Sequence, residues 1–169
     1  MKLSKNTKRL LIILGVAIVF ALSLMIASLL LKGKDPQPAL NITGVAEDGS
    51  LTSLSDHFGK KATVLLFFDV ETPKALELLE QIDALAPKYD AEVMAVACHG
   101  KMEEQKKKLS ELEIAMSNII YDVEGSAVKT YNVGATPVTY FIDKFGMVRE
   151  VFLSSITDKT LEKALAALD

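Results

Sequence analysis

The sequence predicts an α/β domain, a central mixed β-sheet flanked by helices, that follows one N-terminal transmembrane helix. Three observations predict it. Apolar runs of strand length alternate with amphipathic segments of helix length from residue 39 to the C-terminus. Residues 138–142 and 147–153 are two such runs joined by a short turn, so they must pair antiparallel in an otherwise mainly parallel sheet. Residues 10–31 form a run of 22 residues without a charge.

The uncharged run is long enough to be a membrane anchor. At ~1.5 Å of rise per residue it spans roughly 33 Å, against a hydrocarbon core of ~30 Å. A cleaved signal peptide has a shorter apolar region followed by a small-x-small site, whereas here Leu30 and Leu31 continue the run past Ala27 and Ser28. We therefore expect an uncleaved signal-anchor helix in the cell membrane.

Flanking charge sets the expected orientation. Four basic residues and no acid lie in residues 1–9, against two lysines just after the run. Because basic flanks stay on the cytoplasmic side, residues 1–9 should be a cytoplasmic tail. Residues 32–38 should form a linker, with prolines that keep it extended, and residues 39–169 should form an extracytoplasmic domain.

Charge and cysteine content exclude several functions for that domain. Residues 35–169 hold 13 basic and 22 acidic residues, a formal net charge of −9, so we expect no nucleic-acid partner. The basic run 106–108 lies among glutamates and is typical of a solvated helix face. Cys98 is the single cysteine, so the chain forms no internal disulfide.

Each element of the domain has its own signal. An unbroken apolar run predicts a central strand covered on both faces, 63–68. Thr72 as N-cap and Pro73 at the first helical position begin a helix that Pro87 ends. The other elements expected are a turn at 47–49, a helical turn at 53–59, strands 92–97, 118–121, 138–142 and 147–153, a helix 101–112 with Leu112 facing the core, a helix 125–131, and a last helix with Asp158 as its N-cap.

Five segments, in this order, resemble the thioredoxin-like family. The resemblance is nearest to the membrane-anchored TlpA/ResA-type members, which share a redoxin-type (AhpC/TSA-like) layout. The segments are Pro38–Ile42, Asp48–Asp56, Thr63–Phe68, Gly134–Asp143 and Phe145–Val148. They resemble the family's opening segment, its first hairpin, the strand before the active site, the cis-proline segment and the last hairpin. The resemblance implies a thioredoxin-like fold and a role in cell redox homeostasis.

The active-site motif itself is degenerate. The family's Trp-Cys-x-Pro-Cys becomes Glu71, Thr72, Pro73, Lys74 and Ala75 in a gapless alignment. Exchange of disulfides needs a thiolate nucleophile and a second, resolving thiol, and a threonine hydroxyl supplies neither.

The acids that the family uses beside its thiols are missing as well. The buried acid below the active site would fall at Leu66, and the acid of the first helix would fall at Leu78, one residue from Glu77. We therefore expect no dithiol oxidoreductase activity.

Cys98 offers the one alternative thiol. It follows the strand 92–97 beside His99, and it is either a small buried hydrophobic residue or a reactive thiol. Adjacent residues of an extended chain point to opposite sides, so His99 is badly placed to activate Cys98. With two scattered histidines and one cysteine the chain lacks metal-ligand spacing, and we expect no metal and no other cofactor.

Thr136 and Pro137 are the remaining site candidates. The resemblance implies a cis bond before Pro137 and a Thr136 backbone that pairs with an extended polypeptide; the alternative is that the proline only shapes its loop. Asp69 and Glu71 place two carboxylates near the same site, where they would repel acidic partners.

The leading hypothesis is a redox-inactive domain that binds a protein or peptide near Thr72, Thr136 and Pro137. The alternatives are a thiol-disulfide oxidoreductase or peroxidase-like enzyme that uses Cys98, and a structural component of a membrane complex.

Overall fold

The computed structural model describes residues 36–114, 116 and 118–168. The predicted cytoplasmic tail 1–9, the predicted membrane-spanning segment 10–31 and the first part of the linker lie outside the described residues. Within the described ranges, no helix has the length and apolar character needed to cross a bilayer. Residues from Pro36 onward form one compact unit.

Strands and helices alternate along this unit much as the sequence predicts. The strands are β1 (Gln37–Pro38), β2 (Thr43–Ala46), β3 (Leu51–Ser53), β4 (Ala62–Phe68), β5 (Ala91–Ala97), β6 (Ile119–Tyr121), β7 (Val138–Ile142) and β8 (Met147–Phe152). The α-helices are α2 (Pro73–Leu85), α3 (Met102–Glu111), α4 (Ser126–Thr130) and α5 (Asp158–Ala166), and the 3-10 helices are η1 (Leu54–His57) and η2 (Ala86–Tyr89).

The strands that the structure describes form one eight-stranded sheet in the order β1-β8-β7-β4-β5-β6-β2-β3. Parallel pairing is confined to β4–β5 and β5–β6, and the other pairs are antiparallel. The expectation of a mainly parallel sheet is therefore wrong. β7 runs antiparallel to β4 as well as to β8, and β2 runs antiparallel to β6, which periodicity within a strand does not reveal.

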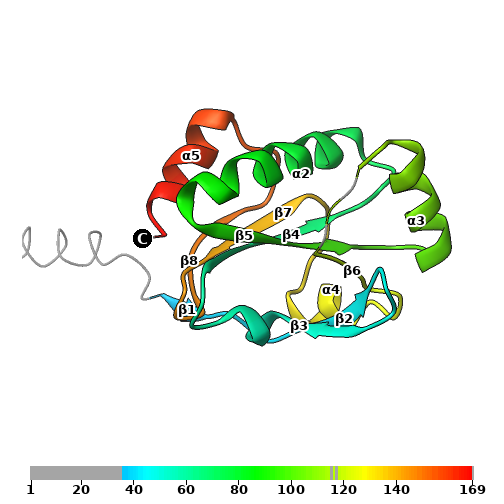
Figure 1. Ribbon diagram of the computed structural model, residues 1–169, viewed down its shortest axis with the longest axis horizontal. Helices are drawn as coiled ribbons and strands as arrows, with labels where there is room; N and C mark the ends of the chain where they lie inside the picture. Colours follow the sequence, from blue (N-terminus) through cyan, green and yellow to red (C-terminus); the bar gives the residue numbers. More distant parts are fainter. Residues whose placement is uncertain (1–35, 115, 117, 169) are drawn as a thin grey trace, which may run out of the picture. The chain divides into compact units, whose positions relative to one another are not determined.

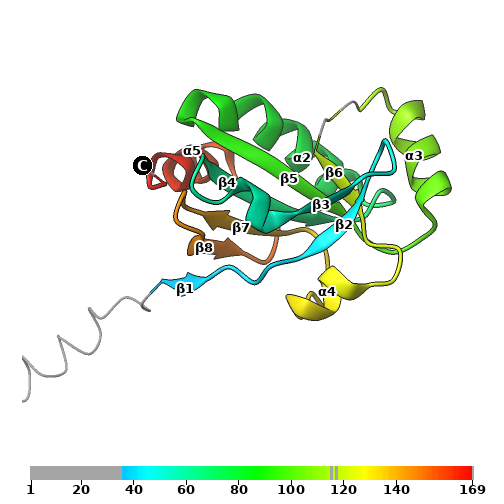
Figure 2. The same cartoon turned by 60° about the horizontal axis from the view of Figure 1, so that its bottom comes forward.

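Two hydrophobic layers enclose the central strands. On one face α2 and α5 pack against alternate residues of β4, including Leu66 and Phe68 (Figures 1 and 2). On the other face Leu65 and Phe67 pack against η1, α4 and two tyrosines. Because both faces are covered, every residue of β4 is buried, as its unbroken apolar sequence predicts.

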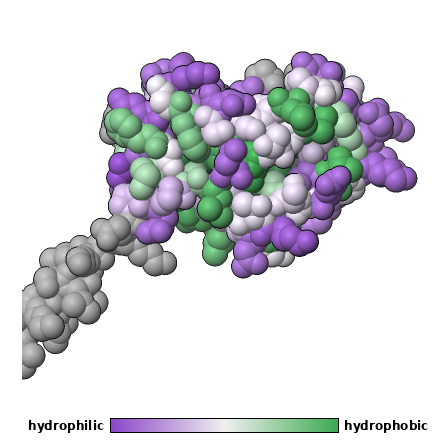
Figure 3. Space-filling view, turned by 90° about the horizontal axis from the view of Figure 1, so that it is seen from below, coloured by the Kyte–Doolittle hydropathy of each residue, from purple (hydrophilic) through white to green (hydrophobic). Residues whose placement is uncertain are grey.

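Among the described residues, only short elements cover the second face of the sheet. Its layer consists of the short elements η1 and α4 and of Tyr131 and Tyr140, whose rings lie 5.2 and 6.0 Å from the ring of Phe67. Tyr131 Oη donates a hydrogen bond to the Leu40 carbonyl (2.7 Å). Figure 3 views the molecule from this side and shows hydrophobic groups interspersed with hydrophilic residues. The two tyrosines therefore belong to the core and its rim.

Three details differ from the sequence expectations. Gln37 and Pro38, expected in the linker, pair with β8 as strand β1. Leu112, expected to face the core, is 44% exposed because α3 ends one residue earlier. The N-cap of α5 is Thr157, whose side chain accepts a hydrogen bond from the Thr160 amide, and Asp158 is the first helical residue.

Candidate functional site

The degenerate motif lies at the end of the sheet where β4 and β5 finish and β7 begins. Phe68 pairs with Ala97, the last residue of β5, and Phe67 pairs with Val138, the first residue of β7. Parallel pairing brings the two strand ends together, and antiparallel pairing brings the start of β7 beside them. The segments 69–75, 98–100 and 134–137 therefore converge at one end of the domain.

A tight turn connects β4 to α2. Asp69 organises it: its Oδ1 accepts a hydrogen bond from the Glu71 amide (2.9 Å), and its carbonyl accepts one from the Thr72 amide (3.0 Å). Aspartate favours such turns because its side chain can bond to the backbone two residues ahead. This turn fixes the direction in which α2 leaves the sheet.

The four positions of the degenerate motif form the start of α2. Thr72 is the N-cap and Pro73 follows at the first helical position, as the sequence predicts. The Thr72 side chain is half-buried and forms no capping hydrogen bond, Pro73 and Lys74 are exposed, and Ala75 is completely buried in the layer beneath α2. Neither of the positions that carry sulfur in the family therefore holds a group capable of thiol chemistry.

Cys98 lies on the other side of the sheet from Ala75. Its side chain has no exposed area and belongs to the core layer with Phe67 and Val96, whereas Ala75 belongs to the layer with α2. Burial, together with the negative charge of Asp122, raises the pKa of the Cys98 thiol to about 12. The thiol is neutral and enclosed, and it cannot stand in for a sulfur at the start of α2.

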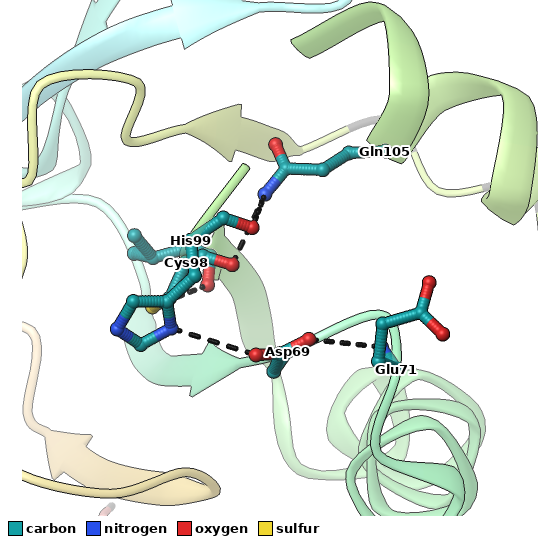
Figure 4. Close-up of polar contacts among 6 residues, drawn as sticks. Asp69, Glu71, Cys98, His99 and Gln105 are labelled. Atoms are coloured by element: carbon teal, nitrogen blue, oxygen red, sulfur yellow. Dashed lines mark hydrogen bonds and ion pairs between the residues drawn. The ribbon is translucent and has the colours of Figure 1, made fainter. Parts of the chain in front are cut away.

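His99 points away from the core, as expected, although it lies beyond the end of β5. It has a left-handed backbone (φ 58°), its side chain is 62% exposed, and its Nδ1 lies 3.5 Å from Asp69 Oδ2 (Figure 4). Glu71 has a basic neighbour too, with its carboxylate 3.6 Å from Lys108 Nζ. Exposed ion pairs of this kind are weak, but they reduce the negative field expected from the two carboxylates.

Gln105 of α3 is a site residue that the sequence does not reveal. It is buried, and its Nε2 donates hydrogen bonds to the carbonyls of Cys98 (3.1 Å) and His99 (3.0 Å), as Figure 4 shows. These two bonds hold the loop after β5 against α3. In the sequence Gln105 lies in a charged helix, where nothing distinguishes it from its solvated neighbours.

Thr136 and Pro137 lie at the start of β7. The bond between them is cis, as the resemblance implies. Pro137 is buried and Thr136 is half-buried, and within the described residues Thr136 takes part in no hydrogen bond. The backbone N–H and C=O of Thr136 are therefore available to a partner, whereas the Pro137 ring is largely covered.

The chemistry open to this end of the domain is limited. Within the part of the chain that the structure describes, no group of three or more His, Cys, Asp or Glu side chains is placed to hold a metal ion. The groups that do converge are carboxylates, an imidazole, a threonine hydroxyl and open backbone, which suit hydrogen bonding to a partner.

The fold and this arrangement define the class of protein, a thioredoxin-like domain of the TlpA/ResA type. A family model described as the AhpC/TSA family matches residues 36–151, and the chain belongs to that family. Among curated proteins, it is 24% identical over 139 residues to the thiol-disulfide oxidoreductase ResA of Geobacillus kaustophilus, covering 77% of this chain and 79% of that protein.

Solved structures show the same fold. A candidate thiol:disulfide interchange protein DsbE of Chlorobium tepidum superposes with a TM-score of 0.70 at 21% identity, covering 80% of this chain and 97% of that one. The exposed lipoprotein thioredoxin Etrx1 of Streptococcus pneumoniae superposes with a TM-score of 0.62 at 24% identity, covering 76% and 100%.

Proposed function

We propose that this chain is a membrane-anchored, extracytoplasmic thioredoxin-like protein that binds a partner polypeptide and has no dithiol activity. The observation that carries the proposal is the location of sulfur. Thr72 and Ala75 occupy the two thiol positions, and Cys98, the single cysteine, is buried in the opposite layer of the core. A domain without an accessible thiol retains the frame of the fold but not its exchange chemistry.

Open backbone at the start of β7 supports polypeptide binding. An extended segment could add beside Thr136 as an extra strand, with main-chain hydrogen bonds to the N–H and C=O that are unpaired in the described structure. The half-buried Thr72 and the exposed Pro73 lie at the same end of the sheet and would contact its side chains. Because Asp69 and Glu71 each have a basic neighbour, charge selection against acidic partners would be mild.

The membrane and topology parts of the proposal rest on the uncharged run 10–31 and its basic flank. Under this proposal, residues 1–9 lie in the cytoplasm and residues from 36 onward lie outside the cell membrane.

Insulin reduction tests the absence of dithiol activity. The purified full chain should give no turnover above the background of dithiothreitol alone, whereas a thioredoxin assayed beside it should precipitate insulin rapidly. Robust turnover would refute the proposal.

Photocrosslinking tests the binding surface. A photoreactive residue at position 72 should yield one discrete adduct in membranes, and the same residue at Lys159, exposed on α5, should not. Equal crosslinking at both positions, or none at 72, would contradict binding at the degenerate site.

A further inference from the structure

The tip of the β7–β8 hairpin carries an exposed aromatic residue. Phe145 is 73% exposed, and its amide is held by the Asp143 side chain (2.9 Å), which fixes the conformation of the tip. Lys144 Nζ lies 5.5 Å from the centroid of the Phe145 ring. An ordered turn therefore presents a large apolar side chain to solvent together with a cation.

Two lysines that have no ion-pair partner among the described residues lie near this tip, although the domain as a whole is acidic. The turn before β4 adjoins the hairpin, since the Gly59 amide donates to the Lys144 carbonyl (2.7 Å), and it brings Lys60 to the same end. Within the described residues neither Lys60 nor Lys144 forms an ion pair.

Most acids at this end have basic neighbours, and Asp56 of η1 instead accepts a hydrogen bond from the Ser53 amide (3.0 Å). Asp143 pairs with Arg149, and Asp90 pairs with Lys61 (2.9 Å). Glu92 lies 2.7 Å from His57 Nδ1. At this end the lysines without an ion-pair partner in the described structure, Lys60 and Lys144, therefore outnumber the acids without a basic neighbour.

The chain also enters the domain at this end. In β1, Pro38 pairs with Met147 of the hairpin, and the next amide, that of Ala39, donates to the Gly146 carbonyl (2.8 Å). Six residues separate Leu31, the end of the uncharged run, from Pro38, so that seven residue-to-residue steps connect them. Fully extended they reach at most about 25 Å. A domain of this size has a radius of gyration of about 14 Å, so a linker of this length limits how far the hairpin can move from the bilayer.

We propose that the hairpin tip is a second membrane contact: Phe145 enters the interfacial region of a bilayer containing anionic phospholipid, and Lys60 and Lys144 lie against its headgroups. The inference rests on the membrane anchor of the proposed function. β4 and β7 run from this end of the sheet to the other, where the degenerate site lies (Figure 1). The contact would therefore hold the polypeptide-binding end away from the membrane.

A tryptophan probe tests the proposal, because the chain has no Trp of its own. Full-length Phe145→Trp is reconstituted in vesicles of phosphatidylcholine and phosphatidylglycerol that contain lipid brominated near the top of the acyl chain. Val123→Trp is the matched control, since Val123 is 55% exposed and follows β6 at the site end of the sheet. The probe at 145 should lose about half its emission to the bromines, and the probe at 123 should lose little.

Charge is tested in the same vesicles. Lys60→Glu in the Phe145→Trp background should reduce quenching, whereas Lys129→Glu, an exposed change on α4, should not. Quenching should also weaken in pure phosphatidylcholine. Anchored protein in which neither probe is quenched, or both are quenched equally, overturns the hairpin contact and leaves the anchor intact. Failure of every variant to float with the vesicles overturns the anchor and this inference with it.

Discussion

Cys98 decides what chemistry is open to this chain, because it is the single thiol. Its pKa of about 12 has burial as the first cause, and the charges of Asp122 and Asp69 raise it further. At neutral pH about one thiol in 10⁵ would be ionised, against a few per cent for an exposed cysteine. Cys98 therefore behaves as a core residue, and an enzyme that relied on it would first have to open the fold.

We predict that iodoacetamide labels Cys98 slowly in the native chain and completely after denaturation. Between pH 7 and pH 9 the slow native rate should rise about tenfold per pH unit without levelling off, since both values lie far below the pKa of about 12, whereas the rate of an exposed cysteine should begin to level off near its pKa of about 8.5. Mass spectrometry of the labelled chain measures both rates. Rapid native labelling at pH 7 would show that the thiol is reachable and would favour a one-cysteine enzyme.

Gln105 should control access to that thiol. Gln105→Ala removes the donor to the carbonyls of Cys98 and His99 and leaves both without this partner. Loss of a partner for buried polar groups costs roughly 1–3 kcal/mol. We expect a lower midpoint in urea and faster native labelling of Cys98.

The matched control is Gln81→Ala, an exposed glutamine on α2, which should change neither quantity. If Gln105→Ala leaves the labelling rate of Cys98 unchanged, then Gln105 does not hold the loop closed.

The role of a site residue could be predicted from the sequence where it depends only on its neighbours along the chain. Thr72 and Pro73 at the start of α2 follow from capping preferences. Cys98 and His99 were expected to point in opposite directions, and they do, but the left-handed backbone of His99 lies outside the rule of strand alternation. Gln105 was not predictable, because its role depends on how α3 folds back over the carbonyls of the loop that precedes it. The same limit applies to Lys108, whose contact with Glu71 connects α3 to the turn before α2.

At the scale of elements, the start of α2 should still support thiol chemistry if sulfur is returned to it. Thiols at a helix N-terminus have a lowered pKa, and residues three apart on one helix face are close enough to bridge. Thr72→Cys with Ala75→Cys should therefore form a disulfide and give measurable insulin reduction. The rate should stay below that of a thioredoxin, because Leu66 is apolar and cannot transfer a proton to or from the buried sulfur.

The control for this double variant is Thr72→Ser with Ala75→Ser, which changes the polarity of the same two positions without adding sulfur. It should be inactive, and each single cysteine variant should fail to sustain turnover. A double cysteine variant that folds, by circular dichroism, but neither forms the disulfide nor reduces insulin would show that the helix start has lost the required geometry.

The β7–β8 hairpin depends on an ionised Asp143. Burial raises the pKa of this carboxyl, but hydrogen bonds from the Met147 and Phe145 amides and from the Arg149 guanidinium outweigh it and hold the pKa below its ordinary value. A lowered pKa contributes stability above the unfolded-state pKa of about 3.9, and that stability is lost as pH falls through the folded value.

Asp143→Asn should therefore lower the free energy of unfolding by roughly 1–3 kcal/mol at neutral pH. The difference from the native chain should shrink below about pH 4, as Asp143 itself becomes protonated. Urea titrations across pH measure this, with the exposed Glu162→Gln of α5 as a control. A difference that persists unchanged into acid would mean that shape, and not charge, accounts for the role of Asp143.

The positions of most helices and strands could be predicted from the sequence. Which strands pair with one another in the sheet could not. β4 was evident from its unbroken apolar run, and the β7–β8 hairpin from its short turn. The antiparallel contact of β7 with β4 depends on where α4 returns the chain, which no pattern within β7 encodes. β1 is two residues long, and its sequence Gln-Pro reads as linker until β8 is present to pair with it.

For the whole molecule, the two ends of the sheet carry different chemistry. One end holds the degenerate motif, the buried Pro137 and an open Thr136 backbone, and the other holds an exposed aromatic tip with unpaired lysines. A net charge of −9 over residues 35–169 would keep most of the domain away from an anionic membrane, and the end that carries the two unpaired lysines is the part that could approach it. An anchored adaptor with this charge distribution would present its binding end to partners outside the membrane.

The two membrane proposals require the domain to lie outside the cytoplasmic membrane, and we expect the charges that flank residues 10–31 to set that orientation. Replacing the four basic residues of segment 1–9 by glutamine leaves the two lysines after residue 31 as the dominant basic flank. Because the more basic flank is retained inside, a substantial fraction of this variant should invert. Protease added to spheroplasts should digest the domain of the native chain and spare that of inverted molecules. Replacing the two lysines instead should leave the native pattern unchanged, and digestion that is identical for all three chains would refute the topology on which both membrane proposals depend.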